Sequence, residues 1–168
     1  KIETGDLAGY ITTIDSTSAT MLELVNDLLD VAKVEAGKFD VICAEGDISD
    51  VIAERIESFK PQATSKNLKI IVDVEKNLQA AWFDKVRVKQ VLNNLLSNAI
   101  KYTESGEIRV KVAVEKVNGV SIDILVSVAD TGIGIESNQI ESLFSKFGQL
   151  ESGRDKAGLK SSGLGLYI

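Results

Sequence analysis

The chain has 168 residues, and its 19 basic side chains against 25 acidic ones give a formal net charge of −6. This length suits one domain, or one domain with an appended element, and the apolar content of 44% is typical of a globular protein. The single cysteine, Cys43, excludes a disulfide framework, and the absence of histidine excludes His-ligated metals and histidine phosphorylation within these residues. The acidic balance argues against nucleic acid as a partner, and no apolar run is long enough to span a membrane.

The first segment has the pattern of a long helix that ends at Gly37. Apolar residues, with one serine among them, recur at alternating steps of four and three at Leu7, Ile11, Ile14, Ser18, Met21, Val25, Leu28 and Ala32. One helix alone cannot bury such a stripe. The pattern therefore favours a bundle or dimerisation helix, with a core helix of the same domain as the alternative.

The elements that follow mix helices and strands. We expect a short strand over 39–44, then a helix that Asp47 caps and that Pro61 kinks or ends near Lys60. Alternating apolar residues predict a strand over 68–74. Asp84 opens the next helix, whose predicted apolar face consists of Val88, Val91, Leu92, Leu95 and Ala99.

Two further strands, over 108–114 and 120–128, are expected to pair through a tight turn at Asn118-Gly119. This order of elements predicts an α+β fold in which helices cover one face of a sheet.

Three stretches carry residues suited to ligand binding. In the helix after Asp84, a polar stripe runs beside the apolar face and consists of Gln90, Asn94, Asn98 and Lys101. Asparagine is unfavourable inside a helix, so its repetition favours carbonyl oxygens aimed at a hard cation such as Mg²⁺. An ordinary polar face is the alternative.

The other two stretches are rich in glycine. Asp130-Thr131-Gly132-Ile133-Gly134-Ile135 follows a strand, and a buried aspartate with two glycines would let a ligand approach the backbone, although a plain turn is the alternative. Gly163-Leu164-Gly165-Leu166 stands at the apparent start of a helix, whose free amides bind phosphate. The basic segment 148–162 before it is predicted to form a lid, with a plain surface loop as the alternative.

In this order, the three stretches resemble the catalytic ATP-binding domain of sensor histidine kinases, within the gyrase, chaperone, kinase and mismatch-repair ATPase superfamily. Residues 94–103 match the asparagine box of that family, and residues 130–135 match its first glycine box. Residues 143–147 resemble its phenylalanine box, and residues 162–168 its second glycine box. Residues 24–38 resemble the second helix of its dimerisation bundle.

The resemblance implies a fold and a domain organisation. Residues 39–168 would form a Bergerat-type two-layer α/β sandwich, with a mixed sheet covered by helices, and residues 1–38 would form part of the dimerisation bundle. The family's phosphoacceptor histidine would lie upstream of Lys1. We therefore expect a fragment, truncated at its C-terminus as well because the family's closing strands would follow Ile168.

The resemblance also implies ATP and Mg²⁺ as cofactors and assigns roles to residues. Asn98 would coordinate the metal with support from Asn94, Lys101 would lie near the phosphates, Tyr102 against the adenine, and Asp130 on the adenine amino group. The implied nucleotide-binding set is Asn94, Asn98, Lys101, Tyr102, Asp130, Gly132, Gly134, Ile135, Ser162, Gly163, Leu164, Gly165 and Leu166. No residue of the chain is expected to be the phosphoacceptor, and Phe144 and Phe147 are expected to pack in the core.

The implied function is transfer of the γ-phosphoryl group of ATP to a histidine on a dimerisation helix. Superfamily members that hydrolyse ATP carry a glutamate base at the position of Asn94, and asparagine cannot accept a proton at neutral pH. An ATP-hydrolysing switch and a non-catalytic nucleotide-binding dimerisation module are the alternatives. The expected partners are a second copy of the parent protein and a response-regulator receiver domain, in the cytoplasm, without nucleic acid or direct membrane contact.

Overall fold

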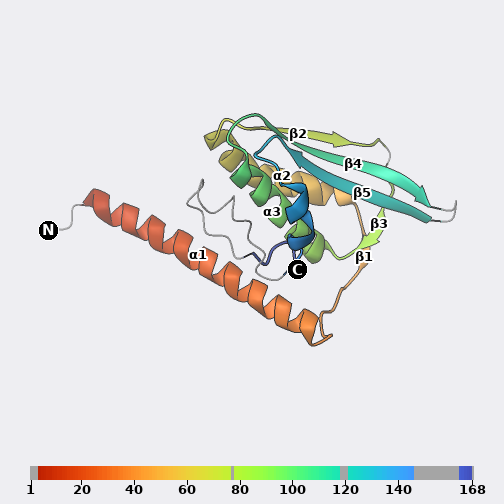
Figure 1. Ribbon diagram of the computed structural model, residues 1–168, viewed down its shortest axis with the longest axis horizontal. Helices are drawn as coiled ribbons and strands as arrows, with labels where there is room; N and C mark the ends of the chain where they lie inside the picture. The colour runs from red at the N-terminus through yellow and green to blue at the C-terminus, as the bar shows by residue number, and fades with distance from the viewer. Residues whose placement is uncertain (1–3, 77, 118–120, 146–162, 168) are drawn as a thin grey trace. The chain divides into compact units, whose positions relative to one another are not determined.

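The computed structural model describes residues 4–76, 78–117, 121–145 and 163–167. Figure 1 shows their elements in the order α1, β1, α2, β2, β3, α3, β4 and β5, followed by a short 3₁₀ helix, η1 (Ser137–Ser142). The chain divides into two compact units. The first contains α1 and the described segments 141–145 and 163–167, and the second contains residues 41–140. The expected domain boundary after residue 38 stays a prediction.

The long first helix is confirmed as α1 (Thr4–Glu35). It ends in a Schellman motif, in which Gly37 adopts φ +63° and the amide of Lys38 donates to the carbonyl of Lys33 over 2.8 Å. The large apolar members of the heptad stripe are each between 48% and 68% exposed, namely Leu7, Ile11, Ile14, Met21, Val25 and Leu28. The partner that would bury this stripe stays a prediction.

The first strand lies later in the chain than predicted. Residues 39–43 form no strand, and β1 (Ala44–Gly46) pairs antiparallel with β3 (Ala81–Phe83). The amide of Ile42 donates instead to the carboxylate of Asp84 over 2.8 Å. The prediction of a strand over 39–44 was wrong because the three residues of β3 offer partners only from residue 44 onward.

The second helix is longer than predicted. Asp47 caps α2 (Ile48–Ser65) as expected, accepting a hydrogen bond from the amide of Ser49 over 2.7 Å. The helix does not end near Lys60, because Pro61 lies inside it. A proline removes one intrahelical hydrogen bond, whereas the continued helix buries Ala63 in the core. Burial of this last turn therefore outweighs the local preference.

The third helix, α3 (Lys85–Tyr102), begins at the predicted cap. The buried Asp84 carboxylate accepts hydrogen bonds from the amides of Ile42, Val86 and Arg87. These bonds, that of Ile42 first, lower the pKa of Asp84 because they stabilise its charged form.

The apolar face of α3 was predicted in part. Its buried residues are Leu92, Leu96, Ala99 and Ile100. Val91 was expected on that face but is 51% exposed, and Leu95 is half-buried. The buried stripe is thus turned by one position toward Leu96 and Ile100, which belong to the hydrophobic core.

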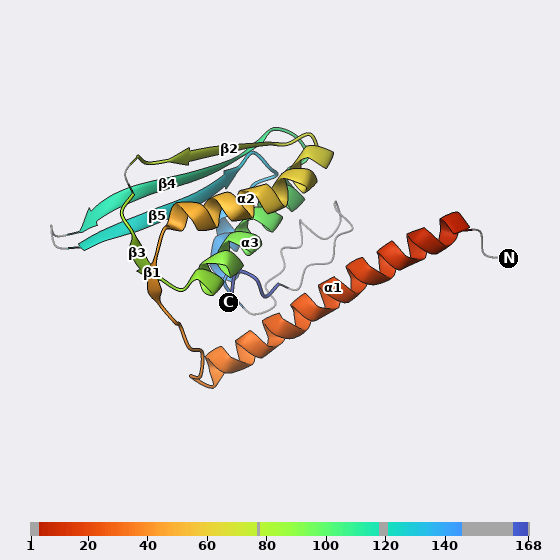
Figure 2. The same ribbon diagram turned by 180° about the vertical axis from the view of Figure 1, so that it is seen from behind.

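The sheet of the second unit is mixed, with the strand order β2-β4-β5. β2 (Lys69–Val74) runs parallel to β4 (Glu107–Val117), and β4 runs antiparallel to β5 (Ser121–Asp130). The predicted β4–β5 pairing is confirmed, while its turn at Asn118-Gly119 lies outside the described residues. Figures 1 and 2 show α2 and α3 over one face of this sheet, which confirms the α+β class and the two-layer sandwich.

The core lies between this sheet face and the two helices. The alternate residues Ile108, Val110 and Val112 of β4 are almost fully buried, as are Val51 and Ile52 of α2. Each such side chain stabilises the fold by about 1.5–3 kcal/mol relative to exposure. This packing places the end of α3 and the end of β5 at one edge of the sandwich, since Asp130 pairs with Ile108 at the start of β4.

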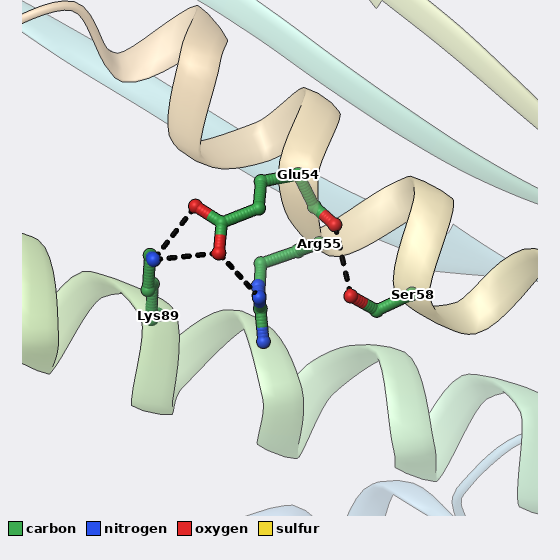
Figure 3. A network of polar contacts seen from close by, with 4 residues as sticks. All are labelled: Glu54, Arg55, Ser58 and Lys89. Atoms are coloured by element: carbon green, nitrogen blue, oxygen red, sulfur yellow. Dashed lines mark hydrogen bonds and ion pairs between the residues drawn. The ribbon is translucent and has the colours of Figure 1, made fainter.

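A polar network also joins α2 to α3 (Figure 3). The Glu54 carboxylate of α2 accepts hydrogen bonds from Lys89 of α3 over 2.7 Å and from its neighbour Arg55 over 2.7 Å. These contacts, that of Lys89 first, lower the pKa of Glu54. Because the contacts of Glu54 with Lys89 and Arg55 are exposed to solvent, we infer that they orient the two helices and contribute little to stability.

Candidate functional site

The predicted polar stripe of α3 lies along one partly buried side of the helix. Gln90, Asn94, Asn98 and Lys101 are all half-buried, and their spacing of three and four residues puts them on one face. The Gln90 side chain accepts a hydrogen bond from Arg87 over 2.8 Å. The Asn98 carboxamide makes no hydrogen bond to any described residue, which leaves its oxygen available to a ligand.

Asp130 is the last residue of β5, and its carboxylate shapes the turn that follows. One carboxylate oxygen, Oδ1, accepts a hydrogen bond from the amide of Gly132 over 2.8 Å. Asp130 was expected to be buried, and that expectation was wrong: the residue is exposed. It ends β5, which is an edge strand of the sheet, and its neighbours Ala129 and Thr131 are exposed as well. An exposed carboxylate with one oxygen fixed by the backbone can still offer its other oxygen to a hydrogen-bond donor.

The end of α3 contacts the turn after β5 directly. The carbonyl oxygen of Tyr102 accepts a hydrogen bond from the amide of Ile133 over 3.3 Å. A Cβ atom added to Gly132 would lie 2.5 Å from that same oxygen and 2.7 Å from Oδ1 of Asp130. Gly132 is therefore needed for the close approach of the turn to the helix. The structure thus brings the asparagine-bearing helix and the Asp130 turn together.

Thr131 fixes the same turn to the segment between α3 and β4. Its hydroxyl oxygen accepts a hydrogen bond from the amide of Glu107 over 3.1 Å and donates to the carbonyl of Ser105 over 3.3 Å. Gly106 adopts φ +114°, and a Cβ atom there would lie 2.2 Å from this hydroxyl oxygen. Thr131 was not among the predicted site residues, since a threonine between an aspartate and a glycine has no pattern of its own.

Lys101 and Tyr102 contact each other at the end of α3. The Lys101 ammonium lies 5.1 Å from the centroid of the Tyr102 ring, within the range of a cation–π interaction. The positive charge and the aromatic face therefore lie next to each other, close to the Asp130 turn, whose Ile133 amide donates a hydrogen bond to the Tyr102 carbonyl.

The second glycine box is described only in part. Gly163, Leu164, Gly165 and Leu166 belong to the other compact unit, and Ser162 and the predicted lid over 148–162 lie outside the described residues. The described segment forms a turn, in which the amide of Tyr167 donates to the carbonyl of Leu164 over 3.0 Å, and not yet a helix.

The phenylalanine box was expected to pack in the core. Phe144 is 64% exposed, so this expectation was wrong for that residue. It follows η1, none of whose residues is buried. Phe147 lies outside the described residues.

The residues of the second unit fit a magnesium nucleotide. An available Asn98 oxygen suits Mg²⁺, which prefers oxygen ligands and keeps waters or phosphate oxygens in its other positions. Gly134 adopts φ +69° and has open space where a Cβ atom would lie, which permits a ligand close to the backbone. No group of three or more acidic, cysteine or histidine side chains that could hold a metal by themselves occurs in the described ranges. None of the described helices has the length and apolar character needed to cross a membrane.

Comparison with known proteins identifies the family. The family model described as "Histidine kinase-, DNA gyrase B-, and HSP90-like ATPase" matches residues 83–168, about half of the chain. The chain is 32% identical over 162 residues to sensor histidine kinase GacS of Pseudomonas protegens, and 34% identical over 169 residues to autoinducer 2 sensor kinase/phosphatase LuxQ of Vibrio harveyi. These alignments cover 95% and 99% of this chain but 17% and 20% of the two relatives. The chain thus spans a fifth or less of their length.

A solved structure supports the same family. Full-length ShkA in complex with AMPPNP is similar in structure to this chain, with a TM-score of 0.78 at 28% identity, over 99% of this chain and 33% of that one. The family resemblance drawn from the asparagine and glycine boxes is therefore confirmed. The chain belongs to the histidine kinase-, DNA gyrase B- and HSP90-like ATPase family and carries the catalytic ATP-binding domain of a sensor histidine kinase.

Proposed function

We propose that the chain binds Mg-ATP between the polar stripe of α3 and the turn after β5. The observation that supports this most directly is the contact of the Tyr102 carbonyl with Gly132 and Ile133. This contact joins the helix that carries Asn98 to the turn that follows Asp130. The ShkA structure, to which the chain is similar, was solved with AMPPNP, an ATP analogue.

In this proposal each residue has a defined task. Asn98 holds Mg²⁺, which would neutralise charge on the phosphates, and Asn94 supports it one helical turn away. Lys101 adds positive charge near the phosphates, and Tyr102 packs against the adenine. Asp130 accepts a hydrogen bond from the adenine amino group with the oxygen that Gly132 leaves available. Gly132, Gly134 and Ile135 of the first glycine box let the backbone approach the base. The role expected for the second glycine box, residues 162–166, in binding the phosphates stays a prediction.

The proposed reaction is transfer of the γ-phosphoryl group to a histidine outside these residues. The bond from the γ-phosphorus to its bridging oxygen breaks, a bond to an imidazole nitrogen forms, ADP leaves, and the imidazole releases a proton to solvent. The chain contributes positioning and charge, as is usual for phosphoryl transfer. Asn94 favours this reaction over hydrolysis because an amide cannot activate water as a general base.

The proposed setting is two-component signal transduction. The exposed heptad stripe of α1 suits association with a second copy in a helical bundle, and a response-regulator receiver domain would take the phosphoryl group from the histidine. Both ATP and such receivers are cytoplasmic, so we place this part of the parent protein there. No role in nucleic-acid binding is proposed.

Phosphoryl transfer to a supplied acceptor tests the function. The chain is mixed with Mg²⁺, γ-labelled ATP and the histidine-bearing dimerisation segment of its parent, and label on histidine is measured by its acid lability. We expect transfer by the wild type and by Ser97→Ala, an exposed residue of the same helix, and loss of transfer in Asn98→Ala. Release of free phosphate without an acceptor would favour the hydrolytic alternative, and nucleotide binding without either reaction would favour a non-catalytic module.

A further inference from the structure

Lys66 lies outside the four boxes named above, yet its side chain ends at the helix that carries the asparagines. Its ammonium group donates hydrogen bonds to the carbonyl oxygens of Ile100 over 2.8 Å and of Lys101 over 3.2 Å. Both carbonyls belong to the last turn of α3, where the helix itself supplies no donor. A cation at this end also interacts favourably with the helix dipole.

The next carbonyl of that turn joins the helix to the proposed nucleotide site. The Tyr102 oxygen accepts the amide of Ile133 and abuts Gly132. Three consecutive carbonyls are therefore held at the end of α3, two by Lys66 and one by the turn after β5. If the last helical turn frayed or tilted, the Tyr102 carbonyl would move, and the spacing between Asn98 and Asp130 would change with it.

The backbone of Lys66 is itself held in place. α2 ends in a Schellman motif, in which the amide of Leu68 donates to the carbonyl of Ala63 over 2.9 Å and the amide of Asn67 donates to the carbonyl of Thr64 over 3.0 Å. Asn67 adopts φ +57°, and both Leu68 and Ala63 are buried. A fixed backbone at one end and two carbonyls at the other leave the Lys66 side chain little freedom, so it connects the end of α2 rigidly to the end of α3.

We propose that Lys66 is a positioning residue for the nucleotide site: it holds the last turn of α3 so that Asn98 and Asp130 face one ligand. This inference rests on the proposed function. Lys66 contacts neither of those two side chains, so it would act through the carbonyls of Ile100 and Lys101. Its loss should therefore weaken nucleotide binding while the fold persists.

Mg-ATP binding by the whole chain, measured by calorimetry, tests this role. Lys66→Met keeps an unbranched apolar side chain one atom shorter but removes the donor, and we expect its Kd to rise about five- to tenfold. Lys66→Arg should bind within about twofold of the wild type, since a guanidinium also donates to carbonyls. The matched control is Lys60→Met, which removes an equal charge from an exposed position of α2.

Amide hydrogen exchange without nucleotide gives a second readout. Lys66→Met should speed the exchange of the Ile133 amide relative to Lys60→Met. The reason is that this amide donates to the Tyr102 carbonyl, and Lys66 would no longer fix the helical turn to which that carbonyl belongs. A merely structural role would lower the melting temperature but leave the Kd of the folded chain unchanged. Equal Kd and equal Ile133 exchange in Lys66→Met and Lys60→Met would overturn the inference while leaving the proposed function standing. A wild-type chain without affinity for Mg-ATP would overturn the proposed function and this inference with it.

Discussion

Replacing Gly132 by alanine perturbs the contact on which the proposed site depends. The added Cβ atom would lie 2.5 Å from the carbonyl oxygen and 3.0 Å from the carbonyl carbon of Tyr102. Real contacts of this kind need about 3.4 Å or more, so the turn must move away from α3 by several tenths of an ångström or more. The Tyr102 oxygen cannot yield easily, since it belongs to a helix whose neighbouring carbonyls are held by Lys66.

Two effects of Gly132→Ala should follow. Overpacking at a rigid contact costs about 1–3 kcal/mol of unfolding free energy, which for a chain of this length lowers the melting temperature by about 2–12 °C. The hydrogen bond from Ile133 to Tyr102 should be lost, and Mg-ATP should no longer raise the melting temperature. Thermal unfolding monitored by circular dichroism, with and without Mg-ATP, measures both effects.

The matched control is Gly134→Ala in the same loop. Gly134 has φ +69° but nothing within 4 Å of an added Cβ atom, so this variant reports backbone strain without the clash. Gly132→Ala should therefore lose the hydrogen-exchange protection of the Ile133 amide, which Gly134→Ala should retain. If Gly132→Ala bound Mg-ATP as the wild type does and kept its melting temperature, the proposed geometry of the turn would be wrong.

Three further variants test other parts of the account. Asp130→Asn should keep the turn, because the side-chain amide oxygen can still accept a hydrogen bond from Gly132. It should remove the rise in melting temperature that Mg-ATP induces, because an NH₂ group would then face the adenine amino group. A retained rise would refute the role of Asp130. Thr103→Val should raise the unfolding free energy measured in urea by about 1 kcal/mol, since the Thr103 hydroxyl is fully buried with no hydrogen-bond partner among the described residues; a loss of that size would mean that the hydroxyl is bonded. The hydrogen bonds that Asp84 accepts lower its pKa, so its charged form stabilises the fold at a pH above the ordinary pKa of 3.8. This stability is lost as the pH falls through the lowered pKa. The melting temperature of the wild type should therefore exceed that of Asp84→Asn at pH 6 and approach it at the acid end of a pH series, whereas a gap independent of pH would contradict the assignment.

Features that depend on neighbouring residues were predictable from the sequence. The caps at Asp47 and Asp84 use amides two or three residues away. The pairing of β4 with β5 follows from two alternating runs separated by a short turn signal. The heptad stripe likewise predicted α1.

Features that depend on tertiary packing were not predictable. Pro61 stays inside α2 because the following turn buries Ala63, which no local rule foresees. Val91 is exposed because α3 packs into the core with the face that carries Leu96 and Ile100. The burial predicted for Asp130 was wrong because this residue ends an edge strand, whose last residues are exposed.

The same division applies to the candidate site. Asn98 and Asp130 stood out because they lie in ordered motifs that resemble the asparagine and glycine boxes of one family. Lys66 and Thr131 did not, since their partners lie 34 and 24 residues away in the chain and no spacing reports such contacts. The motifs thus predict which side chains meet the ligand, and the structure is needed to find those that hold them in place.

A crystal structure of this chain with Mg²⁺ and a non-hydrolysable ATP analogue tests the central claim most directly. The account predicts Mg²⁺ at about 2.1 Å from Oδ1 of Asn98 and the adenine amino group within hydrogen-bond distance of the Asp130 carboxylate. A nucleotide bound with its base away from the turn after β5, or a metal that Asn98 does not reach, would contradict it.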